Sequence, residues 1–134
     1  MCIDSGTALT FDIINSSGEY IGGNISPGLS MRARALHEFT SRLPLVDLSE
    51  PETPIGTTTE TAIRNGIIRG VINEINGYIH YYNLKFPKLQ VYFTGGGSIN
   101  FANRLKKRIF ADENLVLKGI NIVLSHVMSL QSIK

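Results

Sequence analysis

The chain has 134 residues, of which 43% are hydrophobic and 18% charged, which is typical of a single globular domain with a hydrophobic core. A net charge of +2 is too small to indicate a nucleic-acid partner, and no apolar run is long enough to predict a membrane-spanning helix. The single cysteine, Cys2, excludes an internal disulfide and favours a reducing compartment. We therefore expect a cytoplasmic protein with no nucleic-acid or membrane partner.

Three strands are predicted at the start of the chain. Residues 1–4 form the first, and residues 7–14 form the second, with alternate apolar residues on one face (Leu9, Phe11 and Ile13). A turn at residues 15–18 leads to a third strand over residues 19–26. Gly22 and Gly23 in that strand indicate a bulge or a close backbone approach. Together the three segments predict an antiparallel meander.

The turn between the first two strands carries the residues with the clearest chemistry. Gly6 lets the backbone come close to a ligand, and the hydroxyls of Ser5 and Thr7 can donate hydrogen bonds to phosphate oxygens. Asp4 can hold a cation that neutralises phosphate charge. A pattern this short also occurs in ordinary polar turns. By itself it does not distinguish a phosphate-binding turn from a β-hairpin with an ordinary polar turn.

A helix is predicted from Ser30, its expected N-cap, to about residue 41. Its expected apolar positions are Met31, Ala35, Leu36 and Phe39. Residues 42–57 contain three prolines and predict an ordered surface loop.

A longer helix is predicted over residues 59–83, where apolar residues recur with helical spacing. These residues are Ile63, Ile67, Val71, Ile75, Tyr78, Ile79 and Tyr82. Gly66 and Gly70 lie one turn apart in it, and each costs about 1 kcal/mol relative to alanine. We expect close packing of another element to offset that cost.

A buried strand is predicted over residues 90–94, followed by Gly95, Gly96 and Gly97 and a helix from Ser98 to about Phe110. A strand, a glycine turn and a helix can hold a nucleotide phosphate, although a tight structural turn gives the same pattern. A last strand over 115–117 and a closing helix over 118–130 complete the chain. The predicted class is α/β, with a mixed sheet covered by helices.

Four segments, DSGTALTFD, GEYIGGNISPGLSMRARAL, IGTTTETAIRNGIIRG and TGGG, resemble the second half of type III pantothenate kinases. These enzymes belong to the acetate and sugar kinase, Hsc70 and actin superfamily. The resemblance runs from Asp4 to about Val127 and implies a ribonuclease-H-like (actin-like ATPase) domain. It also implies a kinase that transfers phosphate from ATP, with Mg²⁺, to pantothenate in the first step of coenzyme A biosynthesis.

The same resemblance implies a role for individual residues. Asp4 falls on the acid that coordinates a monovalent cation, K⁺ or NH₄⁺. Gly6 and Thr7 fall on the turn that contacts ATP phosphates, and Gly95 and Gly96 fall on the glycine pair beside the nucleotide. Thr59, at the start of the long helix, falls on a threonine that contacts pantothenate. It also either caps that helix or faces a ligand. The family is dimeric, with the substrate pocket at the subunit boundary, so a homodimer is expected.

Two family motifs do not occur in this sequence. They are the D-x-G-N-T phosphate loop and the G-x-D-R segment whose aspartate is the family's proposed general base. We therefore expect residues 1–134 to be a single domain, the C-terminal half of a two-domain kinase without the N-terminal domain. No catalytic residue is then assigned in this chain, and it is expected to be inactive alone. The alternatives are a non-catalytic regulatory or scaffolding protein, similar to a transcription accessory factor, and another phosphotransferase or exopolyphosphatase of the superfamily. The I-G-x-x-T segment argues against the latter.

Overall fold

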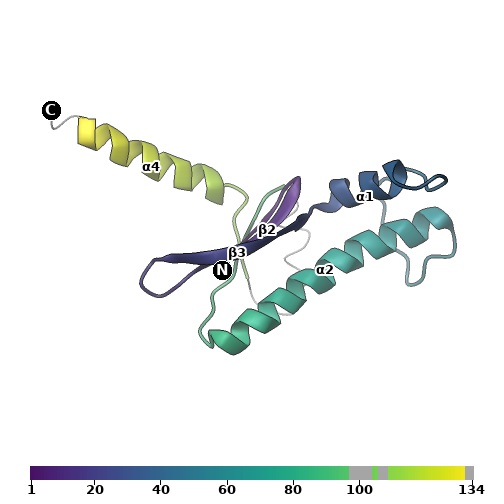
Figure 1. The fold of residues 1–134 in the computed structure, drawn as a ribbon, viewed down its shortest axis with the longest axis horizontal. Helices are drawn as coiled ribbons and strands as arrows, with labels where there is room; N and C mark the ends of the chain where they lie inside the picture. The colour runs from purple at the N-terminus through teal and green to yellow at the C-terminus, as the bar shows by residue number, and fades with distance from the viewer. Residues whose placement is uncertain (97–103, 106–108, 132–134) are drawn as a thin grey trace.

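The structure is a computed structural model that describes residues 1–96, 104–105 and 109–131 (Figure 1). One long helix lies along a face of a central sheet, a shorter helix lies beside its first half, and the last helix extends away from the rest (Figure 1). Among the described residues, no helix is both long and apolar enough to cross a membrane.

The predicted meander is confirmed. It consists of β1 (Cys2–Ser5), β2 (Ala8–Ile14) and β3 (Tyr20–Pro27), each antiparallel to the next. The pairing of β2 with β3 is irregular beside Gly22, which has a φ of 122°. A Cβ on Gly23 would lie 2.2 Å from the carbonyl oxygen of Phe11, so the expected close backbone approach is present.

Two further strands extend the sheet on the other side of β1. β4 (Tyr92–Thr94) pairs in parallel with β1, and β5 (Phe110–Ala111) pairs in parallel with β4. The strand order is β3-β2-β1-β4-β5. The sheet is therefore mixed, as the α/β prediction required, and β2 alone runs against the other four strands.

The long helix α2 (Thr59–Lys85) supplies most of the core. At about 1.5 Å per residue it is about 40 Å long, which is more than the sheet can cover. Its second half packs on one face of the sheet through Ile68, Val71, Ile72, Ile75 and Ile79, against Ile3, Leu9, Phe11, Ile13 and Phe93. Its first half packs against α1 and the loop that follows α1. The predicted apolar stripe is confirmed in both halves.

The first helix, α1 (Leu29–Glu38), differs from its prediction at both ends. Its N-cap is Gly28 rather than Ser30, because the extended Gly28 turns the chain straight from β3 into the helix. The helix ends before residue 41, where the Thr40 hydroxyl donates to the Leu36 carbonyl.

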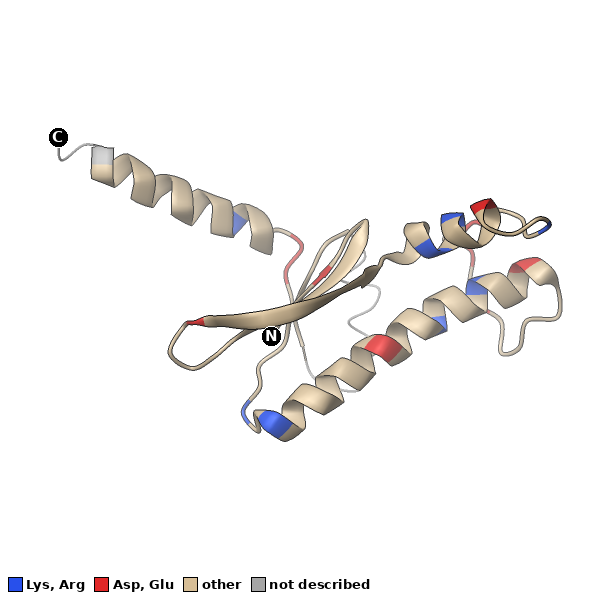
Figure 2. Cartoon of the chain, in the orientation of Figure 1, with Lys and Arg blue, Asp and Glu red and all other residues tan. Residues whose placement is uncertain are grey.

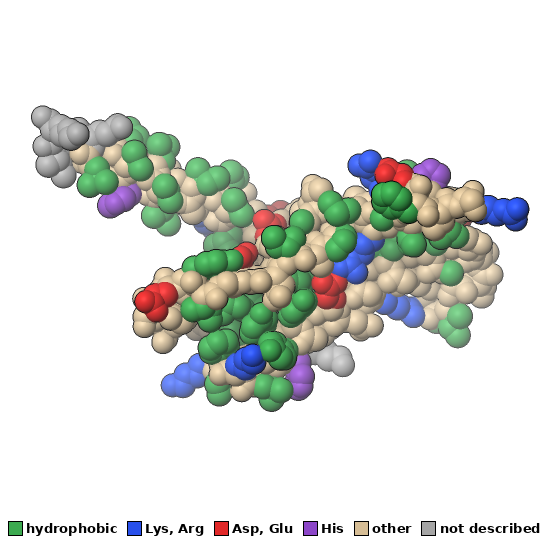
Figure 3. Space-filling model, in the orientation of Figure 1, with side chains coloured by type: hydrophobic (Ala, Val, Ile, Leu, Met, Phe, Trp, Pro, Cys, Tyr) green, Lys and Arg blue, Asp and Glu red, His purple; other side chains and the backbone are tan. Residues whose placement is uncertain are grey.

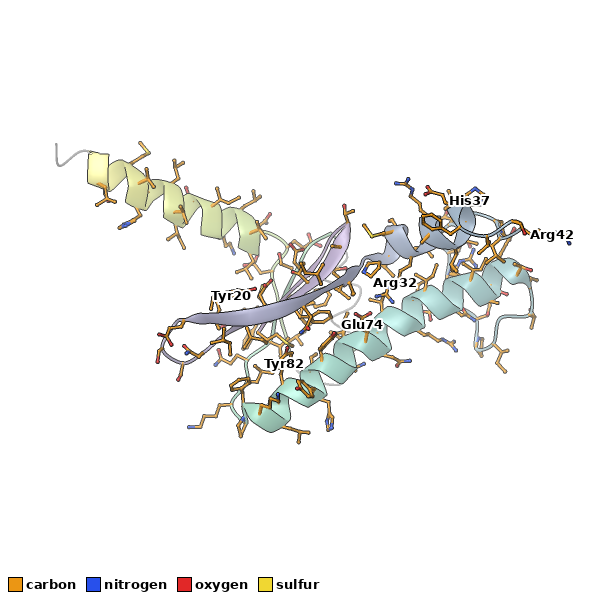
Figure 4. The ribbon with its side chains drawn as sticks, viewed as in Figure 1. Tyr20, Arg32, His37, Arg42, Glu74 and Tyr82 are labelled. Atoms are coloured by element: carbon orange, nitrogen blue, oxygen red, sulfur yellow. The ribbon has the colours of Figure 1, made fainter. Side chains whose placement is uncertain are left out.

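The apolar face predicted for α1 is confirmed at Leu36 but was wrong at Met31 and Phe39. Ala33 is its buried residue, with Leu29 and Leu36 packed beside it, and these positions follow helical spacing. Met31 and Phe39, two of the expected core residues, are exposed. Arg32 lies next to this face and forms an ion pair with Glu74 of α2 (Figure 4).

The closing helix predicted over residues 118–130 is confirmed, but the strand predicted before it was wrong. The last strand is β5 rather than residues 115–117, and α4 (Leu115–Gln131) begins where that strand was expected. The Asp112 carboxylate accepts hydrogen bonds from the Asn114 amide and the Lys118 ammonium group, which fix the turn into the helix. The helix expected over 98–110 lies largely outside the described residues, and its expected end, Phe110, belongs to β5.

Helix α4 leaves its apolar residues in the open (Figure 3). Every residue from 116 to 130 is exposed. The large hydrophobic ones are Val116, Leu117, Ile120, Ile122, Val123, Leu124, Val127, Met128 and Leu130. Lys118 is its only Lys, Arg, Asp or Glu (Figure 2).

The expectation for Gly66 and Gly70 was also wrong within one chain. Apart from the neighbouring backbone of α2 itself, no described atom lies within 4 Å of a Cβ placed on Gly66, and the nearest to Gly70 is Nη1 of Arg32 at 4.0 Å. Close packing inside the described part of the chain therefore does not account for either glycine.

Two neighbouring threonines at the start of α2 give a matched pair of substitutions. Thr58 is the N-cap, and it exchanges hydrogen bonds with Thr61 in a capping box. Thr58→Ala is expected to lower the free energy of unfolding by about 1 kcal/mol. The melting temperature should fall by about 4 °C. Thr59→Ala should change the free energy of unfolding by less than about 0.5 kcal/mol. Thermal unfolding of both variants checks this, and a larger loss for Thr59→Ala would contradict the assignment of the cap.

Candidate functional site

The turn between β1 and β2 presents the backbone and side chains that the sequence singled out. The Gly6 amide donates to the Ala8 carbonyl at 3.0 Å, which closes a tight turn. Gly6 and Thr7 are exposed, whereas Ser5 is buried beneath them. The Thr7 hydroxyl and the Asp4 carboxylate are thus held on a short, fixed segment.

The second glycine turn packs directly against the first. β1 and β4 run in parallel with Asp4 opposite Thr94, so Gly95 follows at the same edge of the sheet. Gly95 has a φ of 94°, which favours glycine. A Cβ on it would lie 2.5 Å from the Ser5 carbonyl oxygen and 2.6 Å from Oδ1 of Asp4. Asp4, Gly6, Thr7 and Gly95 therefore lie together, and Gly96 is the next residue.

A third glycine lies on the other side of the turn, and sequence reasoning missed its role. The Gly28 amide donates to the Thr7 carbonyl at 3.0 Å, and a Cβ on Gly28 would lie 2.3 Å from the Gly6 carbonyl oxygen. Residues 4–7 are thus held between Gly28, at the start of α1, and Gly95. The sequence predicted that the third strand ends near residue 26, but it did not indicate which segment would pack against Gly28.

The sheet face opposite α2 is polar near the site. Asp12 lies on β2 and accepts hydrogen bonds from Thr10 and Tyr20, each at 3.1 Å. The hydrogen bond to Asp12 raises the pKa of the Tyr20 hydroxyl. Burial, and then the nearby carboxylates of Asp12 and Asp4, raise the pKa of the Cys2 thiol, so the thiol is protonated at neutral pH.

Asp4 supplies the carboxylate that the two glycine turns, as far as the structure describes them, can offer a cation. Among the described residues, no group of three His, Cys, Asp or Glu side chains converges on a point. A hard cation at Asp4 would take its other oxygen ligands from backbone carbonyls, water or a phosphate, which is common for cations bound next to nucleotides. The donor set is compatible with a cation that accompanies a phosphate, and it does not resemble a closed protein cage.

Thr59 is not part of this cluster. It is exposed, and the helix that it begins starts beyond the end of the sheet (Figure 1). Within the described part of the chain, its side chain makes no hydrogen bond, because the capping role belongs to Thr58. The structure therefore leaves the Thr59 hydroxyl available, but far along α2 from the glycine turns.

The chain is similar to known proteins over most of its length. Residues 1–81 match the family model described as type III pantothenate kinase. The type III pantothenate kinase of Bacteroides fragilis is 50% identical over 126 residues, which is 94% of this chain and 52% of that protein. The enzymes so named from Phocaeicola vulgatus and Porphyromonas gingivalis are 48% and 41% identical, with 52% and 53% of their lengths covered. The chain thus spans about half the length of the curated relatives it matches.

A solved structure shares the fold. It is that of a Campylobacter jejuni protein assigned to the Baf family of transcriptional activators, with a TM-score of 0.63 and 24% identity. The match covers 96% of this chain and 58% of that one. At this identity the likeness concerns the fold alone.

The two glycines after β4 allow the packing of the site to be tested. Gly95→Ala should lower the free energy of unfolding by more than about 2 kcal/mol, since the methyl group meets Ser5 and Asp4 and the backbone is left-handed. Gly96→Ala is the control, because no described atom lies within 4 Å of its Cβ position. Its effect should stay within about 0.5 kcal/mol. Equal losses in urea unfolding would show that Gly95 does not seat the turn.

Proposed function

Since the chain belongs to the type III pantothenate kinase family, we propose that it forms part of an ATP-dependent kinase that phosphorylates pantothenate. This reaction is the first step of coenzyme A biosynthesis. The observation that carries the proposal is the packing of the Asp4–Thr7 turn against Gly95, which joins two glycine turns at one edge of the sheet. Because the matched relatives are about twice as long, the activity belongs to a protein to which these residues contribute one half.

In the proposed site the turn residues bind the phosphates of ATP. The exposed Thr7 hydroxyl donates to a phosphate oxygen, and Gly6 leaves room for the phosphate to approach the backbone. Gly95 and Gly96 lie beside the nucleotide, where a side chain would obstruct it. Phosphoryl transfer depends mostly on positioning and on charge stabilisation, so a rigid turn held between two glycines suits this task.

Asp4 is proposed to bind the monovalent cation, K⁺ or NH₄⁺, beside the phosphates. Its carboxylate lies against both glycine turns and is only partly exposed. When bound, the cation and Mg²⁺ would offset the negative charge of ATP. Asp4 itself holds the monovalent cation in place beside the phosphates. No residue of this chain is assigned as the base that activates the pantothenate hydroxyl.

The domain is proposed to be ribonuclease-H-like and to form the C-terminal half of a two-domain kinase. The strand order β3-β2-β1-β4-β5, with only β2 reversed, supports this fold. The helix α2 on one face supports it as well.

Thr59 is proposed to bind pantothenate across a subunit boundary. It lies beyond the sheet of its own chain and does not cap its helix, so a second copy could bring it to a phosphate turn. Thr59→Ala should then weaken pantothenate binding without the loss of stability expected for Thr58→Ala.

A face of α2 supports this homodimer. Residues spaced by three or four positions along it form a stripe without a Lys, Arg, Asp or Glu, which we call the small-residue stripe. Its members are Thr59, Ala62, Gly66, Gly70, Asn73, Gly77, His80 and Leu84. Glycine is costly in a helix, and small residues let a second helix approach closely. Contact with the same stripe of another copy would account for Gly66 and Gly70.

The cation site can be tested by comparing two aspartates of one sheet face. In a kinase that carries this chain, Asp4→Asn should lower kcat/KM for ATP by about tenfold to a hundredfold, a loss of about 1.4 to 2.8 kcal/mol. The remaining activity should respond less to K⁺. Asp12→Asn should keep kcat/KM within about threefold, because Asp12 is bonded to Thr10 and Tyr20 away from the turn. Phosphorylation of labelled pantothenate over a series of K⁺ concentrations measures both. An unchanged K⁺ response in Asp4→Asn would refute the cation assignment.

The dimer can be tested with a bulky residue in the small-residue stripe. Gly66→Leu should raise the dissociation constant of the dimer by about tenfold or more, the effect of overpacking by about 1.4 kcal/mol. Gly119→Leu, at an equally open glycine of α4, is the control and should have little effect. Light scattering over a concentration series reads out the mass. A monomeric parent chain at high concentration would contradict the proposal.

A further inference from the structure

The loop between α1 and α2 contains a carboxylate that is almost wholly buried and shared by two arginines. The Glu52 side chain is only 9% exposed. Its Oε2 accepts from Nε of Arg69 at 3.1 Å, and its Oε1 pairs with Nη2 of Arg104. A buried carboxylate is costly unless it is paired, and each arginine supplies a charge-assisted hydrogen bond. Glu52 thus joins two segments that are far apart in the sequence.

The first of these segments is the loop itself, which Arg69 and Asn65 hold on α2. Arg69 donates to the carbonyls of Thr53 and Pro54, at 2.5 and 2.7 Å. The buried Asn65 exchanges hydrogen bonds with the Thr53 backbone at 3.0 and 3.2 Å. The chain continues from here to Thr59. The segment that leads to Thr59, the proposed pantothenate contact, is therefore attached to α2 at Thr53 and Pro54.

The second segment follows the proposed nucleotide turn. Arg104 lies between β4 and β5, in the connection that begins with Gly95 and Gly96. Its side chain is 42% exposed. The ion pair with Glu52 therefore holds Arg104 to the loop before Thr59.

We propose that Glu52 is a positioning residue that couples the nucleotide side of the site to the loop before Thr59, through the carboxylate it shares between Arg69 and Arg104. This coupling rests on the proposed function, because that function assigns the nucleotide to Gly95 and Gly96. Ordering of the turn by a nucleotide then orders residues 52–58, and the linkage is reciprocal.

The contacts of Glu52 allow the coupling to be broken without detaching the loop from α2. Truncation of Arg104 leaves Glu52 paired with Arg69, and Asn65 still holds Thr53. Arg104→Ala should therefore break the link and leave the loop on α2. Glu52→Gln should weaken both attachments. Arg104→Lys can keep a single charged contact with Oε1, so it should restore the link.

The first arm of the test needs no ligand and measures amide hydrogen exchange by NMR. Arg104→Ala should speed exchange at residues 95–96 and 105 by about tenfold or more, the effect of losing a charge-assisted bond. Exchange at the amides of Glu52 and Thr53 should stay within about twofold of the parent chain. Arg104→Lys should return to parent rates. Arg34→Ala is the control, since Arg34 pairs with Glu38 on the surface of α1.

The second arm adds ATP with Mg²⁺. In the parent chain and in Arg104→Lys, the nucleotide should slow exchange both at residues 4–7 and at residues 52–58. In Arg104→Ala and Glu52→Gln, the slowing should persist at 4–7 and be lost at 52–58.

The outcomes distinguish a failure of the coupling through Glu52 from a failure of the proposed nucleotide site. Protection that still reaches 52–58 in Arg104→Ala, or unchanged exchange at 95–96 without ligand, would overturn the coupling. If ATP protects neither segment in the parent chain, the proposed nucleotide site of this chain fails and with it the coupling to a nucleotide. The first arm then decides whether Glu52 ties the two segments at all.

Discussion

The parallel pairing of β1 with β4 is the contact on which the rest of the structure depends. It joins segments about 90 residues apart, as the hydrogen bond from the Met1 amino group to the Gln90 carbonyl illustrates. Ile3 and Phe93 are fully buried in this pairing, so the hydrophobic effect holds the two strands in register. That register places the turn after β1 beside the turn after β4. Both the core under α2 and the proposed nucleotide site follow from it.

Local patterns predicted much of this fold. Alternation defined the meander, and helical spacing defined α2, because a half-buried strand and a long amphipathic helix each show their burial directly in the sequence. Part of the buried face of α1 and the start of α4 were missed. In α1 the contact with α2 decides which residues are buried. In α4 the polar Lys118, Asn121 and Ser125 share one face, but the apolar run over 115–117 at its start also fits a short strand.

The candidate site was predictable to the extent that its residues lie in local turns. Asp4, Gly6, Thr7 and Gly95 each belong to a glycine turn beside a strand, and that signal is visible in the chain. Gly28 and Glu52 were not predictable, since their importance comes from contacts with segments far away in the sequence. The cost of Gly66 was visible, but what offsets it lies outside the described contacts of one chain.

The central claim is that the turns at residues 4–7 and 95–96 together bind the phosphates of ATP. Chemical-shift mapping of the amide spectrum during titration with ATP and Mg²⁺ tests this most directly. The account predicts saturable shifts that are largest at Gly6, Thr7, Gly95 and Gly96, and that are absent when adenosine replaces ATP. Saturable shifts confined to another surface, with these four amides unmoved, would contradict it.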